Sequence, residues 1–241
     1  MVNGSVMSRK DMREPDRFQV VANQAANWVA ARKKQVALIG GAVVAVVLAV
    51  AVVATVQATR SEAAGMAISA LLETAAAPVM AKAPEGGPPK NFPSEEAKEK
   101  AVVAEADSVL AEHGASRASL ALLIRADALY ALKDLDAAAA GYEAFLRTAS
   151  KDDSLRFGAL EGLGLVAEAR GDLVGAAKAY ERMAQDAPGF ADRADLERAR
   201  VLAAAGNIDG ARQLLVKFGE AHKDSTLAGL AAQQLADLGA K

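Results

Sequence analysis

The chain has 241 residues, of which 52% are apolar but only 4% aromatic, and its formal net charge at pH 7 is −2. An apolar content supplied mainly by alanine, leucine and valine favours close-packed helices over strands, which prefer aromatic and β-branched side chains. Because the sequence has no cysteine, disulfides, thiolate zinc sites, a cysteine nucleophile and a lipid-acylated cysteine are excluded. These features predict an all-α protein.

The first 35 residues form a basic arm, with seven Lys or Arg against three Asp or Glu. Asp16 and Gln19 have the spacing of a helical capping box, and apolar residues follow at helical spacing as far as Trp28. The pattern fits an interfacial helix with Trp28 near the lipid headgroups, a docking site for a cytoplasmic partner, or a short extension of the next helix. We expect residues 1–35 to be a cytoplasmic arm that contains this amphipathic helix.

Residues 36–56 form a run of twenty-one residues without a charge, preceded by basic residues at 32, 33 and 34. A helix of that length spans about 32 Å, which is enough to cross the hydrocarbon core of a bilayer. The flanking basic residues predict a single-pass orientation with the N-terminus in the cytoplasm. The alternative is a signal peptide that is cleaved near Ala58. A signal peptide normally has a shorter apolar region than residues 36–56 and a shorter basic segment before it than residues 1–35.

Gly41, Ala45 and Ala49 repeat at four-residue spacing within the predicted span, a pattern that lets transmembrane helices pair. The chain is therefore also a candidate homo-oligomer.

A stripe of apolar residues at helical spacing continues beyond the span, so residues 57–82 are predicted to be a membrane-proximal helix. Residues 83–93 contain four of the seven prolines and a Gly-Gly pair, which indicates a linker or an extended loop. Ser94, followed by two glutamates, has the form of a helix N-cap.

Three segments of the C-terminal part align without gaps, beginning at residues 133, 171 and 206. Each segment begins with two residues that favour a turn, followed by an apolar residue. An alanine comes next in the pattern, and a large apolar residue stands four places after that alanine. A further small residue stands twelve places before each alanine; these residues are Ala126, Gly164 and Ala199. The copies are 38 and 35 residues apart, which assigns an insertion in the first copy to the loop at residues 150–153.

These spacings resemble the tetratricopeptide repeat, a 34-residue helix–turn–helix unit. The resemblance places repeats at about 119–152, 157–190 and 192–225, with a capping helix at 224–240 and the whole module at 94–241. It implies that Ala126, Gly164 and Ala199 contact the second helix of their own unit through Ala138, Ala176 and Ala211. It also implies that the chain folds into an α-solenoid whose first helices line a protein-binding groove.

The groove positions of the family correspond to seven residues of this chain, which the resemblance therefore places in the groove: Leu123, Asp127, Tyr130, Glu161, Glu168, Arg193 and Arg200. Both signs of charge occur among them, which suits a polypeptide partner better than a uniformly charged ligand. The part of the chain after residue 56 has 21 basic and 27 acidic residues, which argues against nucleic acid as a partner.

A basic arm, one membrane span and degenerate helical repeats together are similar to the YfgM-type ancillary subunits of the SecYEG translocon, whose repeat domain resembles that of the cell-division protein CpoB. The resemblance implies a non-enzymatic adaptor in the bacterial inner membrane, with its repeats in the periplasm. Its partners would be translocon components, periplasmic chaperones or exported substrates. The alternative is a structural envelope or cell-division protein that self-assembles through its repeats or its anchor.

No catalytic or cofactor-binding motif is found in the sequence. The two histidines, His113 and His222, are too few for a multi-histidine metal site, and we expect each to lie near a helix end. Since no nucleophile–base pair, phosphate-binding loop or metal-ligand spacing is found, we predict neither a cofactor nor an enzymatic activity.

Overall fold

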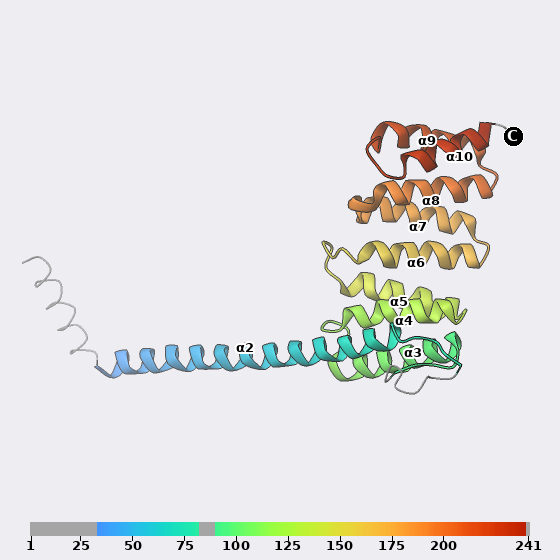
Figure 1. Ribbon diagram of the computed structural model, residues 1–241. Helices are drawn as coiled ribbons and strands as arrows, with labels where there is room; N and C mark the ends of the chain where they lie inside the picture. Colours follow the sequence, from blue (N-terminus) through green and yellow to red (C-terminus); the bar gives the residue numbers. More distant parts are fainter. Residues whose placement is uncertain (1–32, 82–89, 240–241) are drawn as a thin grey trace, which may run out of the picture. The chain divides into compact units, whose positions relative to one another are not determined.

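The computed structural model describes residues 33–81 and 90–239 (Figure 1). The chain divides into two compact units, Met1–Thr59 and Arg60–Lys241, which are described separately below. The predicted amphipathic helix with Trp28 lies outside the described residues, as does most of the predicted linker at 83–93. Every named element within the described part of the chain is a helix, as the composition predicts.

Helix α2 (Lys33–Ala75) has 43 residues and contains the predicted span. Its stretch Val46–Ala75 is long and apolar enough to cross a membrane by length and composition. The large apolar side chains of the first unit, from Val46 to Val56, are 40–63% exposed. The membrane-proximal helix expected at 57–82 is continuous with this helix and ends at Ala75.

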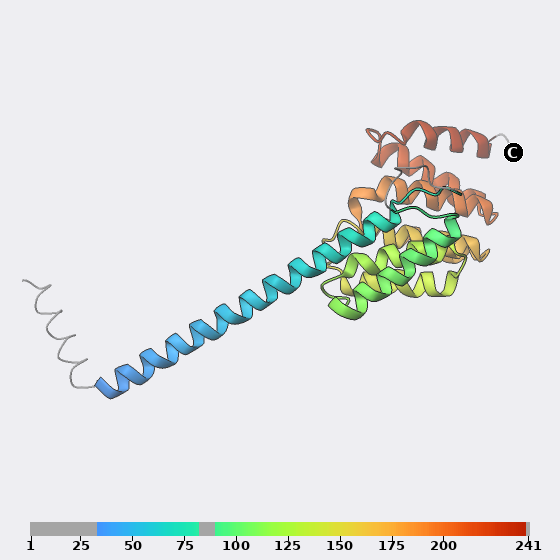
Figure 2. The same cartoon turned by 60° about the horizontal axis from the view of Figure 1, so that its bottom comes forward.

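The described residues of the second unit form eight further α-helices: α3 (Glu95–His113), α4 (Ser119–Ala131), α5 (Leu135–Thr148), α6 (Arg156–Ala169), α7 (Leu173–Asp186), α8 (Ala191–Ala204), α9 (Ile208–Ala221) and α10 (Ala228–Gly239). A short 3₁₀ helix, Pro188–Phe190, precedes α8. Each helix from α3 onward packs against the next one in the chain. Figures 1 and 2 show α3 to α10 as a row of neighbouring helices.

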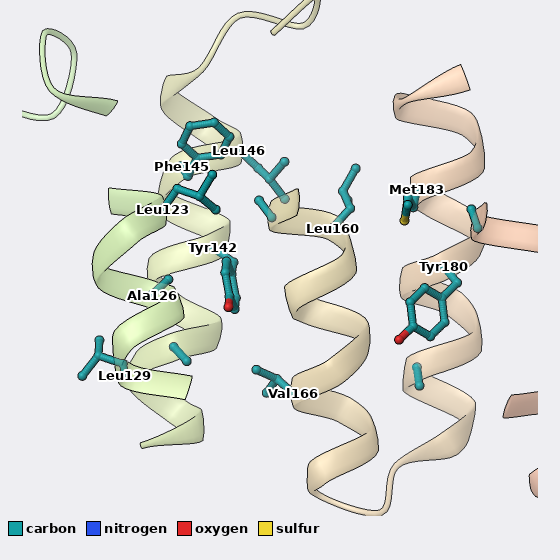
Figure 3. Close-up of a cluster of buried hydrophobic side chains, with 14 of the residues drawn as sticks. Leu123, Ala126, Leu129, Tyr142, Phe145, Leu146, Leu160, Val166, Tyr180 and Met183 are labelled. Carbon is teal, nitrogen blue, oxygen red and sulfur yellow. The ribbon is translucent and has the colours of Figure 1, made fainter. Parts of the chain in front are cut away.

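Three helical hairpins, α4–α5, α6–α7 and α8–α9, match the three segments predicted as repeats, except that α6 and α8 each begin one residue earlier than predicted. The small residues that were expected between their helices are buried: Ala126, Ala138, Gly164, Ala176, Ala199 and Ala211. In the first hairpin, a Cβ placed on Gly141 would lie 2.9 Å from Cβ of Ala126, so the two backbones approach closely there. Around these contacts lies a core that includes Phe145, Leu160 and Val166 (Figure 3).

The turns within the hairpins share one local structure. The side chains of Asp134, Asp172 and Asn207 each accept a hydrogen bond from the backbone N–H three residues later, which caps α5, α7 and α9. The residue before each cap has positive φ, +66° at Lys133, +77° at Gly171 and +84° at Gly206. Glycine adopts this conformation without strain, whereas Lys133 does not.

Additional helices pack at both ends of the three hairpins. Helix α10 packs on α9 and also touches α8, in the place predicted for a capping helix. At the other end, Val102 and Ala106 of α3 share a buried cluster with Leu71 of α2 and Ala121 of α4. Ser94 caps α3 as predicted, since its side chain accepts from the Ala97 N–H at 3.1 Å.

The described segments on either side of residues 82–89 are paired with each other. Met80 N–H donates to the Phe92 carbonyl at 2.8 Å, and Phe92 N–H donates to the Pro78 carbonyl at 3.1 Å. Beside this pairing, Lys90 forms an ion pair of 3.2 Å with Glu105 of α3. Pro78 and Met80 therefore lie beside Phe92.

Candidate protein-binding surface

The seven predicted residues lie on the first helices of the three hairpins. Leu123, Asp127 and Tyr130 are on α4, Glu161 and Glu168 are on α6, and Arg193 and Arg200 are on α8. The structure places Leu123 in the hydrophobic core at 7% exposure, among residues that include Phe145 and Leu160. Leu123 therefore contributes to packing instead of to an accessible surface, and Tyr130 is partly buried against the same core.

Asp127 contacts the hydroxyl of a buried tyrosine on the second helix of the first hairpin. Tyr142, on α5, is 2% exposed, and its hydroxyl donates a 2.8 Å hydrogen bond to Oδ1 of Asp127. Burial, together with Asp127, Tyr130 and Glu161, raises the pKa of Tyr142, so that it stays a neutral donor. Desolvation beside the aromatic ring raises the pKa of Asp127 and outweighs the hydrogen bond from Tyr142, which lowers it.

Glu168 and Arg200 surround a second buried tyrosine in the same way. Tyr180, on α7, is 1% exposed and donates to Oε1 of Glu168 at 2.7 Å. Arg200 donates to the same oxygen at 2.7 Å and also contacts Glu197 at 2.7 Å. Partial desolvation would raise the pKa of Glu168, but the hydrogen bonds from Arg200 and Tyr180 outweigh it and lower that pKa.

Four of the predicted charges pair with one another across the row of helices. Arg193 Nη2 lies 2.6 Å from Glu161 Oε1, and Arg200 Nη2 lies 2.7 Å from Glu168 Oε1. Both pairs join α8 to α6. Because the partners on each helix are seven residues apart, which is about two turns, the two contacts lie one above the other. We call Glu161, Glu168, Arg193 and Arg200 the ion-pair row.

Two glycines on α6 make room for the two tyrosines. A Cβ on Gly162 would lie 2.3 Å from Cζ of Tyr142, and a Cβ on Gly164 would lie 2.6 Å from Cε1 of Tyr180. Figure 3 shows the ring of Tyr142 on the side of α6 that carries Val166, and the hydroxyl of Tyr180 directed from α7 toward α6. Both rings thus pack against the α6 backbone, which places their hydroxyls beside the acids that accept from them.

Some residues of this surface were not predicted from the sequence. The Tyr142 and Tyr180 hydroxyls and Glu197 all contact predicted residues. Leu165 is 38% exposed and lies between Glu161 and Glu168 on α6, four residues after one and three before the other. Those intervals place all three on one side of the helix. The sequence signal for the hydroxyl contacts was an acidic residue at a short interval before each tyrosine. Asp127 precedes Tyr142 by fifteen residues, and Glu168 precedes Tyr180 by twelve.

The two histidines lie at helix ends, as expected. His113 is the last residue of α3, and His222 follows α9 directly. His222 Nε2 lies 3.2 Å from Asp195 of α8, while Ser225 donates to Asp192 at 2.6 Å. Among the described residues, no group of three or more His, Cys, Asp or Glu has an arrangement that could hold a metal ion.

Comparison with known proteins adds no relative from which a role could be transferred. None of the protein-family models matches the sequence, and no curated protein matches it significantly.

Proposed function

We propose that this protein is a non-enzymatic, membrane-anchored adaptor whose helical hairpins form a tetratricopeptide-like solenoid that binds other proteins. The observation that carries the proposal is the set of charged side chains on the first helices of the three hairpins, Asp127 on α4 and the ion-pair row on α6 and α8. Stacked helical repeats present extended surfaces of this kind to polypeptides. The mixed charges, with Leu165 among them, offer ion pairs, hydrogen bonds and an apolar contact to one partner.

The proposed location is the bacterial inner membrane, with a single span and the helical hairpins in the periplasm. Helix α2 supports this location because its apolar part is long enough to span a bilayer. The basic residues before it favour a cytoplasmic N-terminus. In that compartment the natural partners are translocon components, periplasmic chaperones and exported polypeptides.

Affinity purification from solubilised membranes tests this proposal against self-assembly. The full chain, tagged at its N-terminus, is crosslinked in intact cells, solubilised in mild detergent and purified, and the bound proteins are quantified by mass spectrometry. The adaptor proposal expects translocon subunits, chaperones or exported proteins, enriched over a control bait that has the same residues 1–59 without the helical hairpins. Recovery of further copies of the chain alone would favour the envelope-scaffold alternative.

A further inference from the structure

The two buried tyrosines differ in how the acid beside them is compensated. The carboxylate of Glu168, which accepts from Tyr180, also accepts a hydrogen bond from Arg200 of the next hairpin at 2.7 Å. The carboxylate of Asp127 accepts from Tyr142, and within residues 33–81 and 90–239 no Lys, Arg or His forms an ion pair with it. One of the two equivalent acids therefore has a cation beside it, and the other has none.

The stacking of α6 on α4 repeats the stacking of α8 on α6. Arg193 of α8 contacts Glu161 of α6. The copies are 38 and 35 residues apart, so the corresponding residues one hairpin earlier are Gly158 on α6 and Leu123 on α4. These two also face each other, since a Cβ placed on Gly158 would lie 4.0 Å from Cδ2 of Leu123. The two interfaces therefore have the same register.

This register identifies the residue that stands where a second arginine would have to be. Leu165 precedes Arg200 by 35 residues, and Tyr130 precedes Glu168 by 38. Leu165 and Tyr130 each lie seven residues, about two turns, after the corresponding member of the contact just described. They therefore occupy facing positions on α6 and α4. The place that holds a cation between α6 and α8 holds an apolar side chain between α4 and α6.

The groups around Asp127 leave its charge available to a cation from another molecule. Desolvation raises the pKa of Asp127 and Glu99 of α3 raises it further, against the hydrogen bond from Tyr142, so Glu99 adds to the negative potential there. Lys133 lies on the turn after α4, but its ammonium is over the ring of Tyr130, 5.4 Å from the ring centroid. Asp127 is exposed to solvent, so its carboxylate can be reached.

A lysine or arginine side chain has the chemistry that these features match. Such a side chain combines an apolar stem with a charged end group. Leu165 is 38% exposed and Tyr130 is partly exposed, so together they offer apolar surface to the stem. Asp127 offers an ionised acceptor to the end group. One carboxylate is too few oxygen ligands for a calcium or magnesium ion.

We propose that Asp127, Tyr130 and Leu165 form a subsite for one lysine or arginine side chain of a bound polypeptide, at the place that Arg200 fills in the next hairpin. The inference rests on the proposed adaptor function and names the class of side chain that one part of its surface selects.

Thiol–disulfide exchange at position 165 tests the subsite without a natural partner, because the chain has no cysteine of its own. The mixed disulfide of Leu165→Cys with cysteamine carries an ammonium on a stem similar to that of lysine. Val216→Cys on α9, at a position that is 51% exposed, is the matched control. Each full-length variant, in nanodiscs at neutral pH, is equilibrated with 2-mercaptoethanol and with the disulfides of cysteamine and 3-mercaptopropionate. Intact-protein mass spectrometry measures the fraction carrying each group.

The ratio of cysteamine to mercaptopropionate adducts should be about threefold higher at position 165 than at position 216, as expected for a partly exposed ion pair. Asp127→Asn should remove most of this preference. Asp152→Asn, which removes the same charge from an exposed loop position, should leave it unchanged. Equal ratios at positions 165 and 216 would overturn the proposal. So would a preference that survives Asp127→Asn, or an equal loss with Asp152→Asn, in proteins with unchanged circular dichroism.

Leu165→Arg extends the test to bound polypeptides. Its guanidinium should pair with Asp127 and fill the subsite, as Arg200 does in the next hairpin. In the purification from crosslinked cells, this variant should recover several-fold less of the proteins that bind the wild type, whereas Val216→Arg should recover as much. Undiminished recovery with Leu165→Arg would overturn the binding of a polypeptide side chain at this place.

The exchange result is independent of the proposed function. A cysteamine preference at position 165 without recovered partners would support the cation selectivity of the subsite and contradict the adaptor function. Recovered partners without a cysteamine preference would support the adaptor and refute the subsite.

Discussion

At the scale of single residues, Gly162 and Gly164 of α6 have no room for a larger side chain. The rings of Tyr142 and Tyr180 are enclosed, and they lie where the Cβ atoms of larger residues at 162 and 164 would have to go. Gly162→Ala and Gly164→Ala should each lower the free energy of unfolding by about 1–3 kcal/mol, which is the usual cost of overpacking. Urea denaturation followed by circular dichroism measures this loss.

Gly219→Ala on α9 is the matched control, since no atom lies within 4 Å of the position that its Cβ would take. Alanine is favoured over glycine inside a helix, so this change should raise stability by up to about 1 kcal/mol. A neutral effect of Gly162→Ala would show that Tyr142 does not pack as described.

Glu168 should contribute a pH-dependent part of the stability. Its pKa is lowered in the folded protein, because Arg200 and Tyr180 donate to it strongly enough to outweigh its desolvation. The stabilisation is therefore present above the unfolded-state pKa of about 4.3 and is lost as the pH falls through the lower folded-state pKa. Urea denaturation between pH 7 and pH 3 should show the stability gap between the wild type and Glu168→Gln narrowing as the pH falls.

Glu112→Gln provides the comparison, because the Glu112 side chain is 74% exposed at the end of α3. If Glu168→Gln behaved like Glu112→Gln, the hydrogen bonds to Glu168 would not be energetically significant.

At the scale of elements, the ion-pair row joins α8 to α6 through contacts that depend on charge complementarity. Arg193→Glu should place two carboxylates opposite each other and lower the free energy of unfolding by about 1 kcal/mol. Adding Glu161→Arg to this variant should restore most of the lost free energy. A double-mutant cycle by urea denaturation should give a coupling energy of about 0.2–1 kcal/mol that shrinks in 1 M NaCl.

The Glu161–Arg193 pair is the cleaner one to exchange, because Glu168 also accepts from Tyr180. A coupling energy of zero at low salt would contradict a structural role for the row. Charge reversal at Arg193 alone would disturb the contact of α8 with α6 as well as the binding of a partner. Partner capture should therefore be measured on the double variant in which Glu161 and Arg193 are exchanged, because that variant keeps the ion pair.

At the scale of the whole molecule, much of the helical organisation could be predicted from local patterns. Ala138, Ala176 and Ala211 marked the helix contacts within hairpins because small residues allow close packing, and Ser94 marked the start of α3. The loop between α5 and α6 contains residues 150–153, where the longer spacing of the first copy placed an insertion.

Contacts between hairpins were harder to predict, since they depend on how one hairpin stacks on the next. The distance between Glu161 and Arg193 follows from that stacking, and no local pattern encodes it. Leu123 was misplaced for the same reason: the position that the repeat resemblance assigned to a groove is covered by the core around Phe145 and Leu160. The role of Gly162 was missed because its neighbour Tyr142 comes from the preceding hairpin.

Binding of other polypeptides to the surface across α4, α6 and α8 can be measured by site-specific photocrosslinking in intact cells. A photoreactive amino acid replaces Leu165, which is 38% exposed within the ion-pair row, or Val174 on α7, which is 62% exposed. We expect position 165 to crosslink to translocon components, chaperones or exported proteins, and the more exposed position 174 to do so several-fold less. Equal crosslinking at both positions, or adducts at 165 that contain only a second copy of the chain, would contradict the binding of other polypeptides at this surface.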